Sequence, residues 1–157
     1  MQPEVKNLDK VKRNKIISWV LLISWMIVIF IFSNQTGDDS SSKSKFVIYL
    51  FNLMGLDLES KFGDMATFIV RKGAHMTEYF ILYLFIYNVI RHYFSLRKRL
   101  FLSLIFVFLY ACTDEFHQLF IPGRAGAFKD VLIDTGGGMI ALILMSIVTA
   151  RKRPSIK

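Results

Sequence analysis

The sequence predicts an all-α integral membrane protein, a four-helix bundle with short amphipathic helices in the loop between its first and second spans. Three observations predict this fold: the 157-residue chain is 54% apolar, residues 16–32 form an uncharged run, and basic residues gather at the two ends and in one internal turn. The uncharged run has 17 residues, which is about the shortest helix that crosses a bilayer. A chain of this length fits one small membrane domain without a separate soluble one.

The first span is expected at about residues 16–33, after a basic cytoplasmic lead at residues 1–15. This beginning resembles a signal peptide, but the apolar run is longer than a signal core, and the Phe-Ser-Asn-Gln segment at residues 32–35 offers no small-x-small cleavage site. We therefore expect an uncleaved span. A turn-rich, serine-rich stretch follows at residues 34–44.

Residues 45–70 predict two short amphipathic helices, because apolar residues recur there at helical spacing and Gly55 can end the first helix. Neither piece is long enough to cross a membrane. We expect both helices to lie on the outer surface or to dip into it.

The second and third spans must take polar residues into the bilayer. Their apolar runs, residues 79–90 and 100–113, have 12 and 14 residues, whereas a crossing takes about 20 residues at ~1.5 Å each. We therefore expect spans at about residues 71–91 and 99–118, with ionisable residues at one end of each. The Ile-Pro-Gly-Arg-Ala-Gly segment at residues 121–126 breaks the third helix.

The fourth span is expected at about residues 129–150, before a basic tail at residues 151–157. Asp130 and Asp134 lie in its first turns, where the positive end of the helix dipole favours acids. Gly137 and Ala141 form a small-xxx-small pair, which predicts a close approach to another helix.

The distribution of charge predicts the orientation. With the N-terminus in the cytoplasm, the inner segments hold 13 basic and 2 acidic residues, a net +11, and the outer segments hold 7 basic and 10 acidic residues, a net −3. This positive-inside bias predicts two cytoplasmic termini. It also argues against a nucleic-acid partner, despite the overall net charge of +8, and favours contact with membrane lipids.

Ionisable and polar residues converge at the outer ends of the last three spans. They are Lys72, His75, Glu78 and Tyr79 on the second span, Asp114, Glu115, His117 and Gln118 on the third, Arg124 in the loop, and Asp130 and Asp134 on the fourth. Charged groups at membrane depth are costly and need partners, so such a cluster predicts a functional site.

Three interpretations of this cluster stay open. The first is an ion-pair network that holds the helices together. The second is a site for an anionic head group, in which Lys72 and Arg124 grip phosphate or carboxylate and Tyr79, Gln118, Asp130 and Asp134 complete the binding set. In that site the candidates for proton transfer are His75, Glu78, Asp114, Glu115 and His117.

The third interpretation is a metal site. The imidazoles and carboxylates of His75, Glu78, Glu115 and His117, with Asp130 or Asp134, offer the nitrogen and oxygen ligands that suit zinc or manganese. No compact ligand motif such as H-E-x-x-H is present. The sequence therefore assigns no cofactor.

The order of these residues resembles the VanZ-like family. The matching pieces are the Phe-Ser-Asn-Gln segment, Lys72-x-x-His75-x-x-Glu78-Tyr79, Asp114-Glu115-x-His117-Gln118, Pro122-Gly123-Arg124, and Asp130 and Asp134 followed by Gly137-Gly138. They extend over about residues 16–150. The resemblance implies a small bacterial membrane protein of the cell envelope, associated through the family's founding member with resistance to the lipoglycopeptide teicoplanin. It implies no biochemical activity.

The leading hypothesis is therefore a multi-pass protein of the bacterial cytoplasmic membrane that lowers susceptibility to glycopeptides. Its outward-facing pocket would bind an outer-leaflet ligand, such as a lipid-linked cell-wall precursor, a phospholipid or the lipid tail of the drug. The alternatives are a membrane-embedded hydrolase or transferase that acts on phospho- or acyl-lipids, and a non-catalytic accessory or binding protein. A transporter has less support, because the chain shows no inverted repeat.

Overall fold

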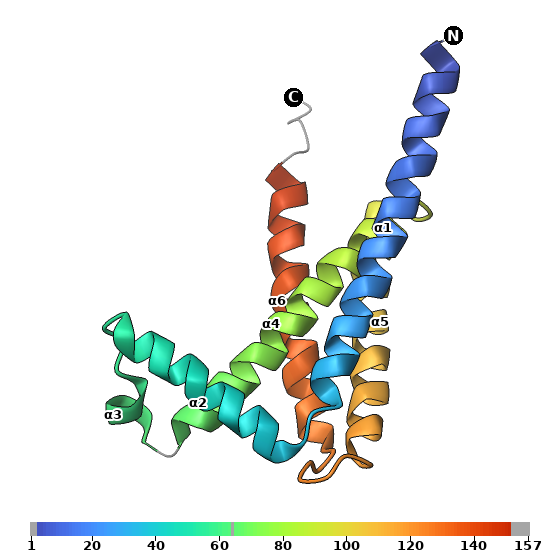
Figure 1. The fold of residues 1–157 in the computed structure, drawn as a ribbon. Coiled ribbons are helices and arrows are strands. Elements are labelled where there is room, and N and C mark those ends of the chain that lie inside the picture. Colours follow the sequence, from blue (N-terminus) through green and yellow to red (C-terminus); the bar gives the residue numbers. More distant parts are fainter. Residues whose placement is uncertain (1–2, 64, 152–157) are drawn as a thin grey trace.

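The computed structural model describes residues 3–63 and 65–151. In this part of the chain there are six α-helices and no strand, as the all-α prediction requires. They are α1 (Pro3–Ser33), α2 (Gly37–Leu53), α3 (Leu58–Phe62), α4 (Met65–Ile90), α5 (Leu96–Gln118) and α6 (Phe128–Arg151). The start of α1 and the end of α6 lie at one end of the molecule, and the α5–α6 loop lies at the other (Figure 1).

Helix α4 is the centre of the assembly, because it packs against each of the other five helices described. Helix α5 packs in addition against α1 and α6. Tyr79 and Tyr83 of α4 are fully buried, together with Val107 of α5 and Ala141 of α6. The core that aligns the long helices is thus built around the aromatic side chains of α4.

Small residues allow α6 to approach α4 closely. Gly137 is buried, and a Cβ atom built on it would collide with the backbone carbonyl oxygen of Met76 in α4. Ala141, one turn later, is also fully buried. The close helix approach expected from this pair of small residues is present.

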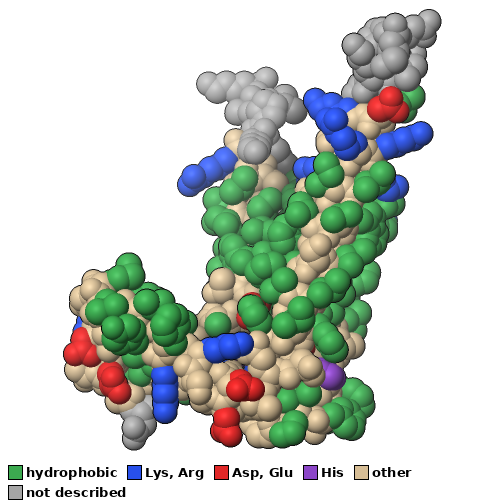
Figure 2. Space-filling model, viewed as in Figure 1, with side chains coloured by type: hydrophobic (Ala, Val, Ile, Leu, Met, Phe, Trp, Pro, Cys, Tyr) green, Lys and Arg blue, Asp and Glu red, His purple; other side chains and the backbone are tan. Residues whose placement is uncertain are grey.

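Three segments are long and apolar enough to cross a membrane: residues 8–33 within α1, all of α5 and all of α6. Large apolar side chains are exposed along them, among others Ile16, Val20, Ile23, Ile27, Phe101, Ile105, Phe106, Ile140, Ile143 and Ile147, and Figure 2 shows this apolar surface. Because so extensive an apolar exterior suits lipid rather than water, the chain is a membrane protein.

Helix α4 has 26 residues but is not among these three segments. Residues 71–78 of this helix include Arg71, Lys72, His75 and Glu78, which lower its apolar content. The predicted second span, which corresponds to α4, therefore stays a prediction, and so does the four-helix bundle.

Helix α2 begins inside the stretch expected to be a turn-rich segment, so that part of the prediction was wrong. Thr36 caps the helix, since its hydroxyl oxygen accepts a hydrogen bond from the backbone N–H of Asp39 at 3.2 Å. Ser41 and Ser44 donate to carbonyl groups four residues back, so these serines are compatible with the helix. After α2, Gly55 turns the chain with φ 83°, as predicted.

Helix α4 begins at Met65, earlier than the expected position near residue 71. Residues 65–70, which were expected to belong to a separate short helix, lengthen α4 instead. Toward the same end of the molecule, α5 ends at Gln118, before the segment at residues 121–126 that was expected to break it.

Candidate functional site: a polar cavity beside the α5–α6 loop

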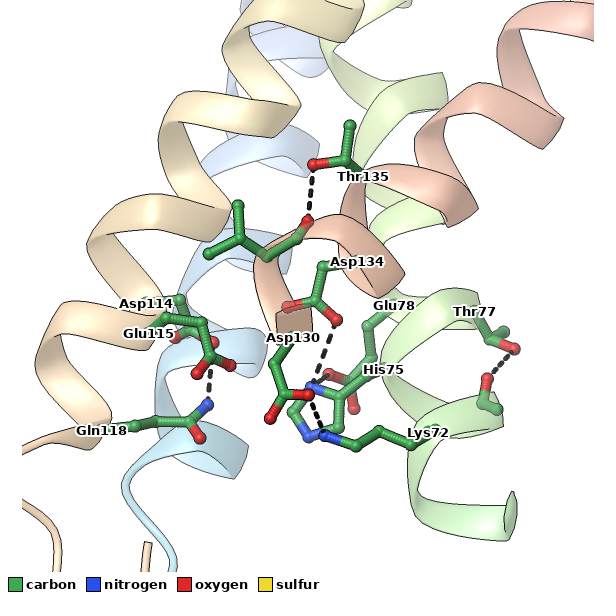
Figure 3. Close-up of polar contacts among 12 residues, drawn as sticks. Lys72, His75, Thr77, Glu78, Asp114, Glu115, Gln118, Asp130, Asp134 and Thr135 are labelled. Atoms are coloured by element: carbon green, nitrogen blue, oxygen red, sulfur yellow. Dashed lines mark hydrogen bonds and ion pairs between the residues drawn. The ribbon is translucent and has the colours of Figure 1, made fainter. Parts of the chain in front are cut away.

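Polar side chains of α4, α5 and α6 point toward one another near the α5–α6 loop (Figure 3). They surround a cavity of about 190 Å³, here called the polar cavity, which is lined by Arg71, Lys72, His75, Glu115, Gln118, Gly123, Arg124, Ala125, Asp130 and Asp134. A second cavity of about 250 Å³ extends toward α2 and shares Arg71, His75 and Arg124 with the first.

Lys72 of α4 and Asp130 of α6 form an ion pair across the polar cavity (Figure 3). Nζ of Lys72 lies 2.6 Å from Oδ1 of Asp130, and the two side chains are 14% and 18% exposed. A pair with so little exposure is screened weakly by salt, and loss of one partner would leave the other charge largely desolvated. The charge of Lys72 is therefore already balanced by Asp130.

The two arginines of the cavity differ from Lys72. Among the described residues, neither Arg71 nor Arg124 has a carboxylate within 4.0 Å. Burial lowers the pKa of Arg124, and the nearby Arg71 lowers that pKa further, but a guanidinium group stays protonated in proteins. Two positive charges that lack a close acidic partner thus line both cavities.

The Pro122-Gly123-Arg124 turn is held against the start of α2. The Gly37 backbone N–H donates to the carbonyl oxygen of Pro122 at 3.2 Å, and a Cβ atom on Gly37 would collide with the Gly123 carbonyl. Gly123 has φ 71°, a conformation that favours glycine. Arg124 in turn donates from Nε to the Gln35 carbonyl oxygen at 3.1 Å, so the turn fixes its position.

Glu115 positions the start of α6. Its Oε2 accepts a hydrogen bond from the backbone N–H of Ala127 at 3.0 Å, one residue before the helix begins. The Glu115 carboxylate therefore lines the polar cavity and also holds the backbone at Ala127.

His75 lies among several carboxylates. Its Nδ1 is 3.9 Å from Oε2 of Glu78 and 3.8 Å from Oδ1 of Asp134. Asp114, which is buried, accepts a hydrogen bond on Oδ2 from Nε2 of Gln118 at 3.2 Å. One ligand atom from each of His75, Asp114 and Asp134 lies within 4.8 Å of the other two, so this group could hold a metal ion.

Most of the predicted site residues come together. Lys72, His75, Glu115, Gln118, Arg124, Asp130 and Asp134 line the polar cavity, and Glu78 lines the second cavity. Asp114 lines neither cavity, but it accepts the hydrogen bond from Gln118, which lines the polar cavity.

Tyr79 and His117 also line neither cavity. Tyr79 is fully buried, and its hydroxyl has no hydrogen-bond partner among the described residues. His117 packs on Phe30 of α1, with ring centroids 5.0 Å apart. The roles of both residues remain predictions.

Arg71 was not among the predicted site residues, although it lines both cavities. A basic residue at the expected start of a span reads as a membrane-boundary residue. The available signal was its spacing, because Arg71 and His75 are four residues apart and therefore share one helical face.

The family model described as VanZ/LLP1 matches residues 18–149. This range contains both cavities, all of α5 and most of the other two apolar segments. Comparison with curated proteins and with solved structures finds no match.

Proposed function

Because the chain belongs to the VanZ/LLP1 family, whose model matches most of its length, we propose that it is a cell-envelope membrane protein that binds the anionic head group of a lipid. The main support is the pair Arg71 and Arg124, two guanidinium groups that line both cavities without a carboxylate within 4.0 Å among the described residues. A bound phosphate would supply the missing negative charge.

The chemistry of the cavity favours phosphate as the anion. Guanidinium groups bind phosphate oxygens in pairs through their planar fork of N–H donors. The two cavities measure about 190 and 250 Å³, below the ~300–1,000 Å³ of pockets that enclose whole small molecules. They fit a head group, and the apolar tail would remain in the surrounding lipid.

In the proposed topology, α1, α4, α5 and α6 all span the bacterial cytoplasmic membrane, with both termini in the cytoplasm. Helix α4 can cross despite its charges, because it packs against the three apolar spans and its Lys72 and His75 line the polar cavity. The positive-inside bias supports this orientation. The cavity would then lie at the depth of outer-leaflet head groups, and α2 and α3 would lie along the outer membrane surface.

A protein of this kind would lower susceptibility to teicoplanin-like glycopeptides by occupying or redistributing the lipid-linked cell-wall precursors on which these drugs act. A second candidate function is a lipid hydrolase or transferase, which the imidazole and carboxylates beside the two arginines favour. Mass spectrometry of lipids from cells with and without the protein separates the two, because only an enzyme yields a new lipid species.

The proposal is tested with the Arg71→Gln variant. Arg71 is a cleaner probe than Arg124, whose side chain also anchors the Gln35 carbonyl. Native mass spectrometry of detergent-purified protein should show phosphatidylglycerol retained by the wild type. The Arg71→Gln variant should bind it about tenfold less tightly or worse, since charge-assisted hydrogen bonds contribute about 1.5–3 kcal/mol.

Lys129→Gln is the matched control, because Lys129 is an exposed cation near the same end that lines neither cavity. Cells that express the Lys129→Gln variant should keep the teicoplanin tolerance of the wild type, and cells with Arg71→Gln should lose it. Equal lipid retention by the wild type and a folded Arg71→Gln variant would refute head-group binding by this cavity.

A further inference from the structure

We propose that His75, Asp114 and Asp134 together bind a divalent transition-metal ion at the inner wall of the polar cavity. The three residues come from three different helices, α4, α5 and α6, and Figure 3 shows their side chains pointing into the same space. Because the packing of the helices brings them together, the site forms only in the folded protein.

The spacing of the ligand atoms suits an ion between them. One atom of each residue lies within 4.8 Å of the other two, and Nδ1 of His75 is 3.8 Å from Oδ1 of Asp134. Two ligands that bind one tetrahedral zinc ion at ~2.1 Å lie ~3.4 Å apart. The imidazole–carboxylate distance thus needs to shorten by only a few tenths of an ångström.

The same distances do not fit direct hydrogen bonds. An imidazolium paired with a carboxylate would donate at about 2.7–2.9 Å, yet Nδ1 of His75 is 3.9 Å from Glu78 and 3.8 Å from Asp134. Nδ1 of His75 and Oδ2 of Asp134 have no hydrogen-bond partner among the described residues.

The Asp134 side chain is only 2% exposed, so its unpaired oxygen lies away from bulk water. A buried carboxylate oxygen without a donor is unfavourable. A cation bound between Asp134 and His75 would satisfy both groups.

The ligand set indicates the class of metal. An imidazole nitrogen with carboxylate oxygens suits zinc or manganese. The hydrogen bond from Gln118 to Asp114, at 3.2 Å, holds one carboxylate in place as an outer-sphere partner does.

Three protein ligands leave a coordination position open, as in catalytic rather than structural zinc sites. Because His75 and Asp134 line the polar cavity, this position would face the cavity and take a water molecule. The inference concerns the same cavity as the proposed function, but the three ligands bind the metal without any lipid.

The test uses the full chain purified in detergent, with any affinity tag removed, stripped by a chelator and titrated with Zn²⁺ or Mn²⁺. Elemental analysis should find about one equivalent bound to the wild type, and the His75→Gln and Asp134→Asn variants should bind at least tenfold more weakly. The His92→Gln and Asp38→Asn variants are the controls, because His92 follows α4 at its far end and Asp38 is exposed at the start of α2. Both should bind as the wild type does.

If the His75→Gln variant does not fold, a spectroscopic measurement on another variant tests whether His75 binds the metal. The chain has three histidines, so the Mn²⁺-loaded His92→Gln/His117→Gln double variant retains only His75. Pulsed electron paramagnetic resonance should detect ¹⁴N coupling from one bound imidazole in this variant.

Absence of that coupling, absence of stoichiometric metal in the wild type, or unchanged binding by folded His75→Gln and Asp134→Asn variants would each overturn the site. None of these results bears on lipid retention by the Arg71→Gln variant, so this proposal and the head-group proposal fail separately.

Discussion

Gly137 lies at the contact between α6 and α4. The space around the Cβ positions of Gly136, Gly137 and Gly138 differs, and it shows which of the three positions require glycine. A Cβ atom on Gly137 would collide with the Met76 carbonyl oxygen, and one on Gly138 would come within 2.8 Å of Cγ1 of Val107 in α5. Gly136 has open space around its Cβ position. Successive residues point about 100° apart on a helix, so Gly137 faces α4, Gly138 faces α5, and Gly136 faces neither.

Replacing Gly137 with alanine should therefore destabilise the protein, and Gly136→Ala is the matched control. The added methyl group at Gly137 meets backbone rather than a flexible side chain, and overpacking of this kind costs about 1–3 kcal/mol. Gly136→Ala should be neutral or slightly stabilising, because alanine is the better helix former by up to ~1 kcal/mol. Thermal unfolding in detergent, followed by circular dichroism, measures both. Equal midpoints for the two variants would contradict the close approach of α6 and α4.

The residues of the polar cluster could be predicted from the sequence. The ion pairs that these residues form with one another could not. The apolar runs at residues 79–90 and 100–113 are too short to cross lipid, so their ionisable neighbours had to enter the membrane. Lys72 appeared as a free anion-binding cation, whereas it pairs with Asp130 at 2.6 Å. That pairing depends on how α4 and α6 are rotated about their axes, which spacing along one helix does not reveal.

At the scale of elements, α2 exposes more large apolar side chains than a helix in water would tolerate. Phe46, Tyr49 and Leu53 are 61%, 57% and 67% exposed, and Figure 2 shows apolar side chains gathered over the α2–α3 part beside acidic ones. Helix α2 packs against α4 and lies to one side of the other long helices (Figure 1). Contact with lipid would cover this face and offset the cost of its exposure.

A cysteine placed at Leu53 should therefore be shielded in lipid vesicles. The experiment uses the Cys112→Ser variant as background, because Cys112 is the chain's one cysteine. In vesicles, a water-soluble maleimide should label a Leu53→Cys variant at least tenfold more slowly than an Asp38→Cys variant, whose site is exposed at the polar start of the same helix. Denaturant should remove the difference. Equal labelling rates in intact vesicles would mean that α2 faces water.

On the scale of the whole molecule, the two ends of the long helices carry different kinds of charged residue. The start of α1, the first turn of α5 with its Arg97-Lys98-Arg99 sequence, and the end of α6 lie at one end. The two cavities, with Arg71, Arg124 and the carboxylates, lie at the other, beside the α5–α6 loop. Such a one-sided separation is what a membrane with one negative, cytoplasmic surface favours.

Reporter fusions test this orientation. Green fluorescent protein fused after the C-terminus should fluoresce, because it folds in the cytoplasm, and alkaline phosphatase inserted at Ala125 should be active, because it folds outside. The cysteine variants provide a control that does not depend on a bulky reporter, since an impermeant maleimide should label an Ala125→Cys variant in intact cells. An Ala125 site that reacts only after the cells are broken would reverse the topology and place the cavity at the inner leaflet.

The sequence by itself determined the class of protein, the approximate positions of the long helices and the end of the molecule at which the polar residues gather. These properties follow from apolar run length and charge count, which are local to each segment of the chain. Only the tertiary structure decided that α4 is the central helix, that Lys72 is paired while Arg71 and Arg124 lack a close carboxylate, and that His75, Asp114 and Asp134 converge. Such relations between helices depend on crossing angles and rotation, which are set by contacts such as Gly137 against Met76.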